Sequence, residues 1–392
     1  MINQEMQKKK PIVAASTWGH PFDASTYSGL PRTIFSRLAQ EDSLCGAHNL
    51  IPGLFPSLMR GRIRSTTIFA PWKCPRTHAI WRYLPSNIEY MTKFMVGVEM
   101  FREADVVFQF GVAGMPKPGL PLLAHIEYPI ESVFKTETYA TNYGFSGLSD
   151  AVQAQAIAGE RIFTDRCDLI WTNTPYTSGL LQKSGVDPAK VRVLTPPGNF
   201  SELTLGERDW TQKKILFVGR NWAVKGGDHL VRAFEILRKI EGEASLTIIG
   251  CDPPKSVRAM DGVHCLGYLS MDEPSERARL LEEYRTSTVF CMPSNWESTG
   301  MVFMEAASAG LPVIMRRIPE TDALYPDELF QKVDDDSPEA LAELLLQDLQ
   351  GGAAVTKRTE EASRFVEENY GLDVFQCKID DLLREVATLS PS

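Results

Sequence analysis

The stretch KKILFVGRNWAVKGGDHLVRAFEILRKI, residues 213–240, contains a complete strand–loop–helix unit. Its apolar run ends at Gly219 and is continuous rather than alternating, which is typical of a parallel strand covered on both faces. After the loop, apolar residues recur at helical spacing, with charged residues on the opposite face. The predicted apolar face of this helix consists of Leu230, Phe234, Leu237 and Ile240.

The same pattern repeats along the chain, because further apolar runs alternate with helical segments. Such alternation predicts doubly wound α/β sheets. A chain of 392 residues also exceeds one ordinary core, so we expect two Rossmann-like domains that face each other across a ligand cleft. The predicted strands lie in 11–16, 105–110, 121–127, 168–173, 191–196, 244–250, 287–293 and 311–315. The expected parts are a domain at 1–198, a linker at 199–212, a second domain at 213–365, and helices at 366–392 that cross back to the first domain.

The composition excludes several classes of protein. No run of about 18 apolar residues is present, which argues against a membrane-spanning helix. The lysines at the N-terminus precede only a short apolar run, so we expect a strand there rather than a signal peptide. Seven scattered cysteines without a C-x-x-C pair predict reduced thiols in the cytoplasm and no zinc site. A net charge of −9 argues against a general nucleic-acid-binding protein.

Two cations and two glycines occupy the loop after the strand that ends at Val218. Loops at the carboxyl ends of such strands bind ligands. Arg220 offers a planar fork to phosphate oxygens, Lys225 offers a point charge, and Gly226-Gly227 lets the backbone approach closely. The alternative interpretation is two solvated loop cations. The loop is neither a Walker A motif nor a G-x-G-x-x-G motif.

Two carboxylates mark a second loop, in PSNWESTGMVFMEAASAGLPVI (293–314). A helix is expected to begin near Gly300, where unpaired backbone amides would suit a diphosphate. Glu297 precedes this helix and Glu305 follows about two turns later, within small apolar residues that predict burial. Because a buried carboxylate needs partners, we expect both acids to accept hydrogen bonds from a sugar or ribose. The alternative is two ordinary acids on a helix surface.

These stretches, with SLTIIG and VHCLGYLS, resemble the donor half of the retaining GT-B glycosyltransferases of the glycogen-synthase-like superfamily, family four, also called glycosyl transferases group one. The N-terminal segment HPFDASTYSGLPRTIFSRL resembles the first strand–loop–helix of that family, with Ser28-Gly29 in place of paired glycines. The resemblance is strong over 213–315 and loose over 30–120.

The resemblance implies roles for matching positions. Arg220 and Lys225 would stabilise the leaving diphosphate, Glu297 would bind the transferred sugar, and Glu305 would bind the ribose hydroxyls. His125 would be directed at the sugar, although a lone histidine at a strand end is more often structural. Positions implied to lie around the donor's phosphates and base are Gly29, Gly219, Gly267, Tyr268, Leu269, Gly300, Met301 and Val302.

The chain departs from the family pattern at three places. Ser298-Thr299 replaces the usual Gly-Phe, MRRIPE replaces a Gly-Gly turn, and PPGNF replaces Pro-Asn-Gly. Arg316 and Arg317 would either contact a charged donor group or bridge domains. The acidic run VDDDS (333–337) lies beyond the donor site and is interpreted as a helix-capping loop. The family needs no metal, so we expect neither a metal site nor a cofactor.

The predicted activity is retaining transfer of a hexose from a UDP- or GDP-sugar to a glycan, a lipid-linked acceptor or a small molecule. One alternative is a nucleotide-sugar epimerase of the same architecture. Another is a non-catalytic partner subunit that binds nucleotide-sugar.

The segment IPGLFPSLMRGRIRSTTIFAPWK (51–73) mixes apolar residues with cations and has no acid. Such a segment suits an anionic membrane surface or a phosphorylated acceptor. We therefore expect 54–64, with Arg60, Arg62 and Arg64, to form part of the acceptor rim and to give peripheral contact with the inner membrane face. The alternative is an amphipathic core element whose arginines are solvated.

Overall fold

The computed structural model describes residues 10–24, 26–50, 80–95, 99–114, 119–137, 140–141 and 144–389. The predicted acceptor rim at 54–64 lies outside these residues. The chain divides into an N-terminal unit, Met1–Leu194 with Gln376–Ser392, and a C-terminal unit, Thr195–Phe375. The expected linker 199–212 falls within the C-terminal unit, because Phe200 and Leu203 are part of its hydrophobic core.

The N-terminal unit contains a six-stranded parallel sheet in the order β2-β1-β3-β4-β5-β6. Apolar side chains fill the inner strands on both faces, as the continuous runs predict. The strands are β1 (Val13–Thr17), β2 (Leu44–Asn49), β3 (Val106–Phe110), β4 (Leu122–His125), β5 (Leu169–Thr172) and β6 (Val191–Val193). The helices are η1 (Thr26–Gly29), α2 (Leu30–Gln40), α5 (Pro85–Met95), η2 (Glu99–Arg102), α6 (Ile130–Lys135), α8 (Asp150–Asp165), α9 (Pro175–Lys183) and η3 (Pro188–Lys190).

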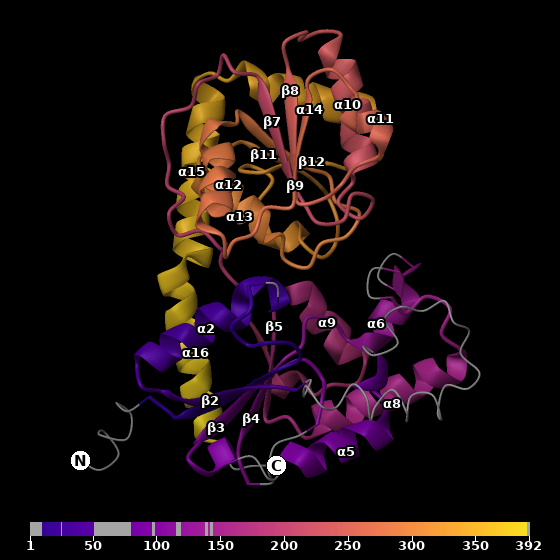
Figure 1. Ribbon diagram of the computed structural model, residues 1–392, viewed down its shortest axis with the longest axis vertical. Coiled ribbons are helices and arrows are strands. Elements are labelled where there is room, and N and C mark those ends of the chain that lie inside the picture. The colour runs from indigo at the N-terminus through magenta and orange to yellow at the C-terminus, as the bar shows by residue number, and fades with distance from the viewer. Residues whose placement is uncertain are drawn as a thin grey trace. The chain divides into compact units, whose positions relative to one another are not determined.

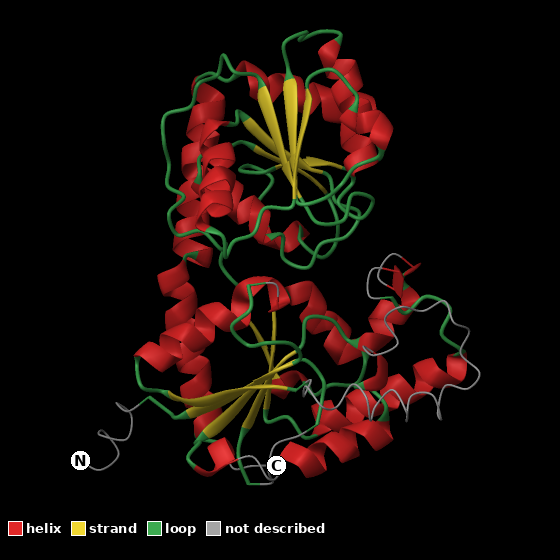
Figure 2. Cartoon of the chain, viewed as in Figure 1, coloured by secondary structure: helices red, strands yellow, loops and turns green. Residues whose placement is uncertain are grey.

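The C-terminal unit contains a second six-stranded parallel sheet, in the order β12-β11-β10-β7-β8-β9. Figure 2 shows helices, in red, covering the strands of each sheet, in yellow. The strands are β7 (Lys214–Val218), β8 (Ser245–Ile249), β9 (Val263–Gly267), β10 (Val289–Met292), β11 (Val313–Arg316) and β12 (Gln331–Val333). The helices are α10 (Gly227–Arg238), α11 (Lys255–Arg258), α12 (Pro274–Thr286), α13 (Met301–Ser308), η4 (Asp322–Leu324), α14 (Pro338–Gln350) and α15 (Ala353–Tyr370). The last helix, α16 (Leu372–Ala387), belongs to the N-terminal unit from Gln376 onward.

The helix predicted after β7 forms as α10, with one correction. Leu230, Phe234 and Leu237 are buried, as expected, but Ile240 is 62% exposed. The helix ends at Arg238, so Ile240 lies beyond the helical periodicity and does not join the apolar face. Ser337 caps α14 by accepting a hydrogen bond from the Ala340 amide at 3.1 Å, which matches the interpretation of 333–337 as a helix-capping loop.

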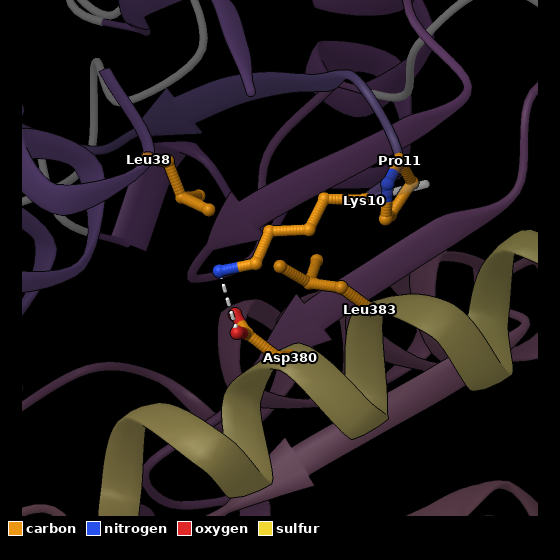
Figure 3. A pocket seen from close by; sticks show the side chains of 5 residues that line it. All are labelled: Lys10, Pro11, Leu38, Asp380 and Leu383. Atoms are coloured by element: carbon orange, nitrogen blue, oxygen red, sulfur yellow. Dashed lines mark ion pairs between the residues drawn. The ribbon is translucent and has the colours of Figure 1, made fainter. Parts of the chain in front are cut away.

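The last helix, α16, packs beside α2 in the N-terminal unit (Figure 1). Arg37 of α2 donates to both carboxylate oxygens of Asp380, at 2.6 and 3.1 Å. Lys10 lies 2.8 Å from the same carboxylate and lines a small hollow with it (Figure 3). Because Lys10 precedes β1, this hollow lies at the amino end of the strand, opposite the edge where ligands bind in such sheets. The residues that line it are Lys10, Pro11, Leu38, Asp380 and Leu383.

Among the helices that the structure describes, none combines the length and the apolar character needed to cross a membrane.

Candidate functional site

The C-terminal sheet reverses its direction of strand addition between β7 and β10. Ligands of doubly wound sheets bind outside the carboxyl ends of the strands at this point, where two loops diverge. The loop after β7 contains Arg220 and Lys225, and the loop after β10 contains Glu297 and Gly300. The topology therefore brings together the two loops that the sequence singles out.

The glycines of the β7–α10 loop permit a close approach of the two loops. Gly226 caps α10 in the left-handed conformation, with φ of 74°. A Cβ atom at this position would lie 1.9 Å from the carbonyl oxygen of Pro293, the first residue of the Glu297 loop. At Gly219 a Cβ atom would lie 2.9 Å from Cγ of Lys225. Both positions therefore lack room for a side chain, and Lys225 is held over the end of β7.

Lys225 and Glu297 form an ion pair between the two loops. Lys225 Nζ donates to Glu297 Oε2 at 2.7 Å, and the side chains keep 18% and 12% of their exposure. The Lys225 ammonium also lies 5.9 Å from the centre of the Trp296 ring. An ammonium has three N–H donors, so Lys225 can hold a phosphate oxygen and the Glu297 carboxylate together. This geometry unites two residues predicted for the site.

Arg220 points to the segment predicted to face the base. Its Nη2 donates to the Tyr268 hydroxyl at 3.1 Å, and its guanidinium carbon lies 5.0 Å from the centre of the same ring. Tyr268 is 54% exposed, whereas Leu269 is buried. Gly267 ends β9 with φ of 68°, which turns the chain here. Arg220 and Tyr268 therefore present an exposed aromatic–cation pair beside the end of β7.

The amino end of α13 supplies unpaired backbone donors. Gly300 caps this helix in the left-handed conformation, with φ of 71°, so the amides of Met301 and Val302 have no intrahelical acceptor. The buried Tyr325 hydroxyl donates to the carbonyls of Thr299 and Gly300, at 2.7 and 3.0 Å. These bonds fix the turn, and the positive end of the helix dipole adds to its affinity for anions.

Glu305 is buried, as predicted, but protein groups satisfy it. Its Oε1 accepts from the backbone amide and the side-chain amide of Asn199, at 3.0 and 3.1 Å. Its Oε2 accepts from the Tyr284 hydroxyl at 2.7 Å. Burial raises the pKa of Glu305 despite these three donors. The cost of burial, which suggested a ligand, is thus met by Asn199 and Tyr284, and the ribose role stays a prediction.

His125 belongs to the N-terminal unit, at the end of β4. Its Nε2 lies 2.8 Å from Asn173 Oδ1, an acceptor, so the proton resides on Nε2 and Nδ1 carries the lone pair. Burial lowers the pKa of His125 to about 4, so the ring is neutral at pH 7. The rings of Trp171 and Phe110 pack against it at 4.4 and 4.8 Å. Core packing fixes this ring, and its contact with a sugar stays a prediction.

Gly29 lies in an unusual turn between β1 and α2. Tyr27, Ser28 and Gly29 have φ of 45°, 56° and 83°, three consecutive residues in the left-handed region. Only glycine adopts this conformation without strain, so the two non-glycine residues are held by their surroundings. Gly29 caps α2, at the loop where the resemblance implies a phosphate.

Arg316 and Arg317 are engaged by acids of the acidic run and its surroundings. Arg316 pairs with Asp336, and Arg317 pairs with Asp334 at 2.6 Å and with Asp322 at 2.8 Å. These partners give both arginines a structural role within the C-terminal unit. No cluster of three metal-binding side chains occurs among the residues described.

Glu160 of α8 is a buried carboxylate that sequence inspection missed. Its Oε2 accepts from the Ile130 amide at 2.8 Å, at the start of α6, while its Oε1 has no partner among the described groups. Burial raises the pKa of Glu160 to about 8. The folded protein thus holds this carboxyl protonated at neutral pH.

We expect Glu160→Gln to reduce the loss of stability at alkaline pH. The pKa of Glu160 is higher in the folded state, so folded protein binds more protons than unfolded protein between about pH 4.5 and 8, and stability falls across this range. Glutamine keeps an acceptor for Ile130 and does not titrate. Urea unfolding at pH 5 and pH 8.5 measures the free energy of unfolding of both proteins. Between these pH values, the free energy of the variant should rise by a few kcal/mol relative to that of the wild type. Parallel curves for the two proteins would contradict this expectation, and Glu131→Gln controls for loss of one charge.

Comparison with known proteins finds a family match within the C-terminal unit. Residues 212–350 match the model of the family described as glycosyl transferases group 1. This stretch has the sequence of a glycosyl transferases group 1 domain. It contains the loops of Arg220, Lys225 and Glu297 and the whole of α13. The predicted resemblance is therefore confirmed for residues 212–350.

A match to a curated relative extends the likeness beyond this stretch. The chain is 27% identical over 273 residues to a D-inositol 3-phosphate glycosyltransferase of Corynebacterium diphtheriae, covering 59% of this chain and 63% of that protein. The match thus spans less than two thirds of the relative.

Solved structures show the same fold. Sucrose-phosphate synthase from Thermosynechococcus elongatus has a TM-score of 0.68 at 14% identity, covering 96% of this chain and 99% of that one. Anabaena HepE, in complex with UDP-glucose, has a TM-score of 0.60 at 10% identity, covering 95% and 100%. Together with the two parallel sheets, these neighbours confirm the GT-B fold.

The structure groups the predicted residues in distinct places. Lys225 and Glu297 form the centre of the candidate site, with Gly300 at its helix and Arg220 beside Tyr268. Glu305 has its own protein partners. Asn199, Tyr284 and Tyr325 were missed: Tyr284 carried only a helical pattern, and Asn199 lies in a polar stretch without periodicity.

Proposed function

We propose that this protein is a retaining, metal-independent glycosyltransferase that uses a nucleotide-diphosphate sugar. The observation that carries the proposal is the Lys225–Glu297 ion pair at the sheet's switch point, beside the amino end of α13. A cation, free amides and a carboxylate are the groups needed to hold a diphosphate and an adjoining sugar. The group 1 sequence of residues 212–350 supports it.

The donor is proposed to be a UDP- or GDP-sugar. HepE, a structural neighbour, was solved with UDP-glucose, and the Corynebacterium relative is named for glycosyl transfer. Lys225 and Arg220 would neutralise charge on the departing diphosphate while the amides of Met301 and Val302 bind its oxygens. Glu297 would accept hydrogen bonds from sugar hydroxyls. Catalysis would then rest on positioning and on electrostatic stabilisation of the leaving group.

A panel assay tests the proposal. The protein is incubated with UDP-, GDP- and dTDP-sugars and a mixed acceptor extract, with and without EDTA, and sugar and nucleoside diphosphate are followed. We expect transfer that persists in EDTA and retains the anomeric configuration. Isomerised donor would instead indicate an epimerase, and binding without turnover a partner subunit. Loss of activity in EDTA, rescued by manganese or magnesium, would reject the metal-independent mechanism.

The acceptor is proposed to be a glycan, a lipid-linked molecule or a small molecule. Peripheral contact with the inner membrane face through 54–64 stays a prediction from the sequence. Co-sedimentation with anionic vesicles at low salt, against a triple Arg→Ser variant at 60, 62 and 64, tests it. Protein that stays in the supernatant at low salt would exclude the contact.

A further inference from the structure

The N-terminal sheet has its own switch point, between β1 and β3. Gly111 follows β3 at this point, and Tyr27 lies in the loop after β1. A Cβ atom at Gly111 would lie 2.3 Å from the Tyr27 hydroxyl and 3.1 Å from Arg82 Nη1. Arg82, from the segment before α5, therefore lies over the position where ligands bind to such a sheet.

Aromatic side chains hold the Arg82 guanidinium in place. Nη1 donates to the Tyr27 hydroxyl at 3.4 Å, and Nη2 donates to the Tyr83 hydroxyl at 3.1 Å. The guanidinium carbon lies 4.9 Å from the centre of the Tyr83 ring and 5.3 Å from that of Trp18. An arginine has five N–H donors, of which these bonds use two. Nε is buried and has no acceptor within the described part of the chain.

Arg82 has no carboxylate partner in an ion pair among the side chains that the structure describes. Glu5 and Glu99 are the only acidic side chains outside that set. Glu160 is near enough to interact with its charge, but Glu160 is bound to the Ile130 amide, and burial raises its pKa to about 8. Arg82 thus keeps a positive charge that these side chains leave uncompensated. Removing such a charge from water costs several kcal/mol, so its retention suggests a bound anion.

The surroundings indicate which molecule brings the anion. Tyr27 contacts both Arg82 and His125. Its hydroxyl accepts the hydrogen bond from Arg82, and the centre of its ring lies 6.1 Å from that of the His125 ring. The cations proposed for the donor's diphosphate, Arg220 and Lys225, belong to the other unit. We propose that Arg82, with the hydroxyl of Tyr83, binds an oxyanion, a phosphate or carboxylate, carried by the acceptor. This inference rests on the proposed function, because it assumes that the N-terminal unit binds a sugar acceptor.

Inorganic phosphate serves as the first probe and needs no transfer activity. Thermal unfolding is followed with rising phosphate, against chloride at equal ionic strength. We expect a saturable rise of the wild-type transition that Arg82→Gln abolishes. Arg161→Gln, an exposed arginine of the same unit, should keep it. Phosphate could also bind at the donor site, and Lys225→Met removes that contribution to the rise of the transition. This variant should keep the contribution that Arg82→Gln abolishes. A full phosphate response in Arg82→Gln would overturn the proposal.

Arg82→Lys keeps the charge without the planar fork, and it carries the test if Arg82→Gln does not fold. Its affinity for phosphate should fall about tenfold, because a lysine ammonium lacks the several fixed N–H donors of the planar guanidinium. Unchanged affinity would reject the proposed geometry.

The acceptor arm compares a sugar phosphate, a uronic acid and a neutral sugar as acceptors. The wild type should prefer one of the two anionic acceptors, and Arg82→Gln should raise its KM at least tenfold while the donor's KM stays constant. Preference for the neutral sugar, or a change confined to the donor's KM, would overturn the proposal. Donor hydrolysis without any acceptor reports on the proposed function separately, so absent hydrolysis and transfer would reject that function while the phosphate result still tests the anion site.

Discussion

Lys225→Met is expected to lower the turnover number at least a hundredfold while the protein stays folded. Among the described residues, the pair of Lys225 with Glu297 is the only ion pair that joins the two loops at the switch point. Removing one charged group that stabilises a leaving diphosphate costs about 3–4 kcal/mol in the transition state, or a factor of about 10² to 10³. Methionine preserves most of the side-chain volume, so the packing over Gly219 should survive.

The measurement is single-turnover release of nucleoside diphosphate, with circular dichroism to establish folding. Lys239→Met, an exposed lysine of the same unit, is the matched control and should turn over like the wild type. Lys225→Met leaves the Glu297 carboxylate without its cation, so this carboxylate could then repel the diphosphate. The double variant Lys225→Met/Glu297→Gln removes that repulsion and leaves only the loss of attraction between Lys225 and the diphosphate. The double variant should remain at least as slow as Lys225→Met. A folded Lys225→Met protein with full activity would remove Lys225 from the proposed mechanism. Arg220→Ala should behave in the same direction.

The inner strands were predictable from the sequence because burial on both faces leaves a continuous apolar run. Each of the nine predicted runs overlaps a strand. Among the described residues, the strands that were missed are β2, β9 and β12, and all three lie at sheet edges. An edge strand has one neighbour and partial exposure, so its residues need not be uniformly apolar. In β2 the sequence LCGAHN is half-buried throughout, and it carries neither a continuous run nor strict alternation.

The candidate site was predictable in its loops but not in its supporting contacts. Arg220, Lys225 and Glu297 stand out because charged residues follow strand ends. The partner Asn199 lies 106 positions from Glu305, and Tyr27 lies 55 positions from Arg82. Such pairings depend on the tertiary fold and leave no local pattern. Arg82 was missed for the same reason, since its lack of an acidic partner is visible only in three dimensions.

Gly226→Ala is expected to destabilise the C-terminal unit by about 2–5 kcal/mol. Gly226 has φ of 74°, a conformation that costs alanine roughly 1 kcal/mol. Its new methyl group would also lie 1.9 Å from the Pro293 carbonyl oxygen and 2.7 Å from the carbonyl carbon. These are backbone atoms, which cannot rotate away as a flexible side chain does, so one of the two ligand loops must move.

That movement should also separate Lys225 from Glu297, because Lys225 directly precedes Gly226 and Pro293 lies four residues before Glu297. Turnover measured well below the unfolding midpoint should therefore fall together with stability. Urea denaturation gives the loss of stability. Gly242→Ala is the matched control, since a Cβ atom there meets nothing within 4 Å, and it should stay within about 0.5 kcal/mol of the wild type. If Gly226→Ala had the same urea midpoint and the same activity as Gly242→Ala, the close approach of the two loops would not position Lys225.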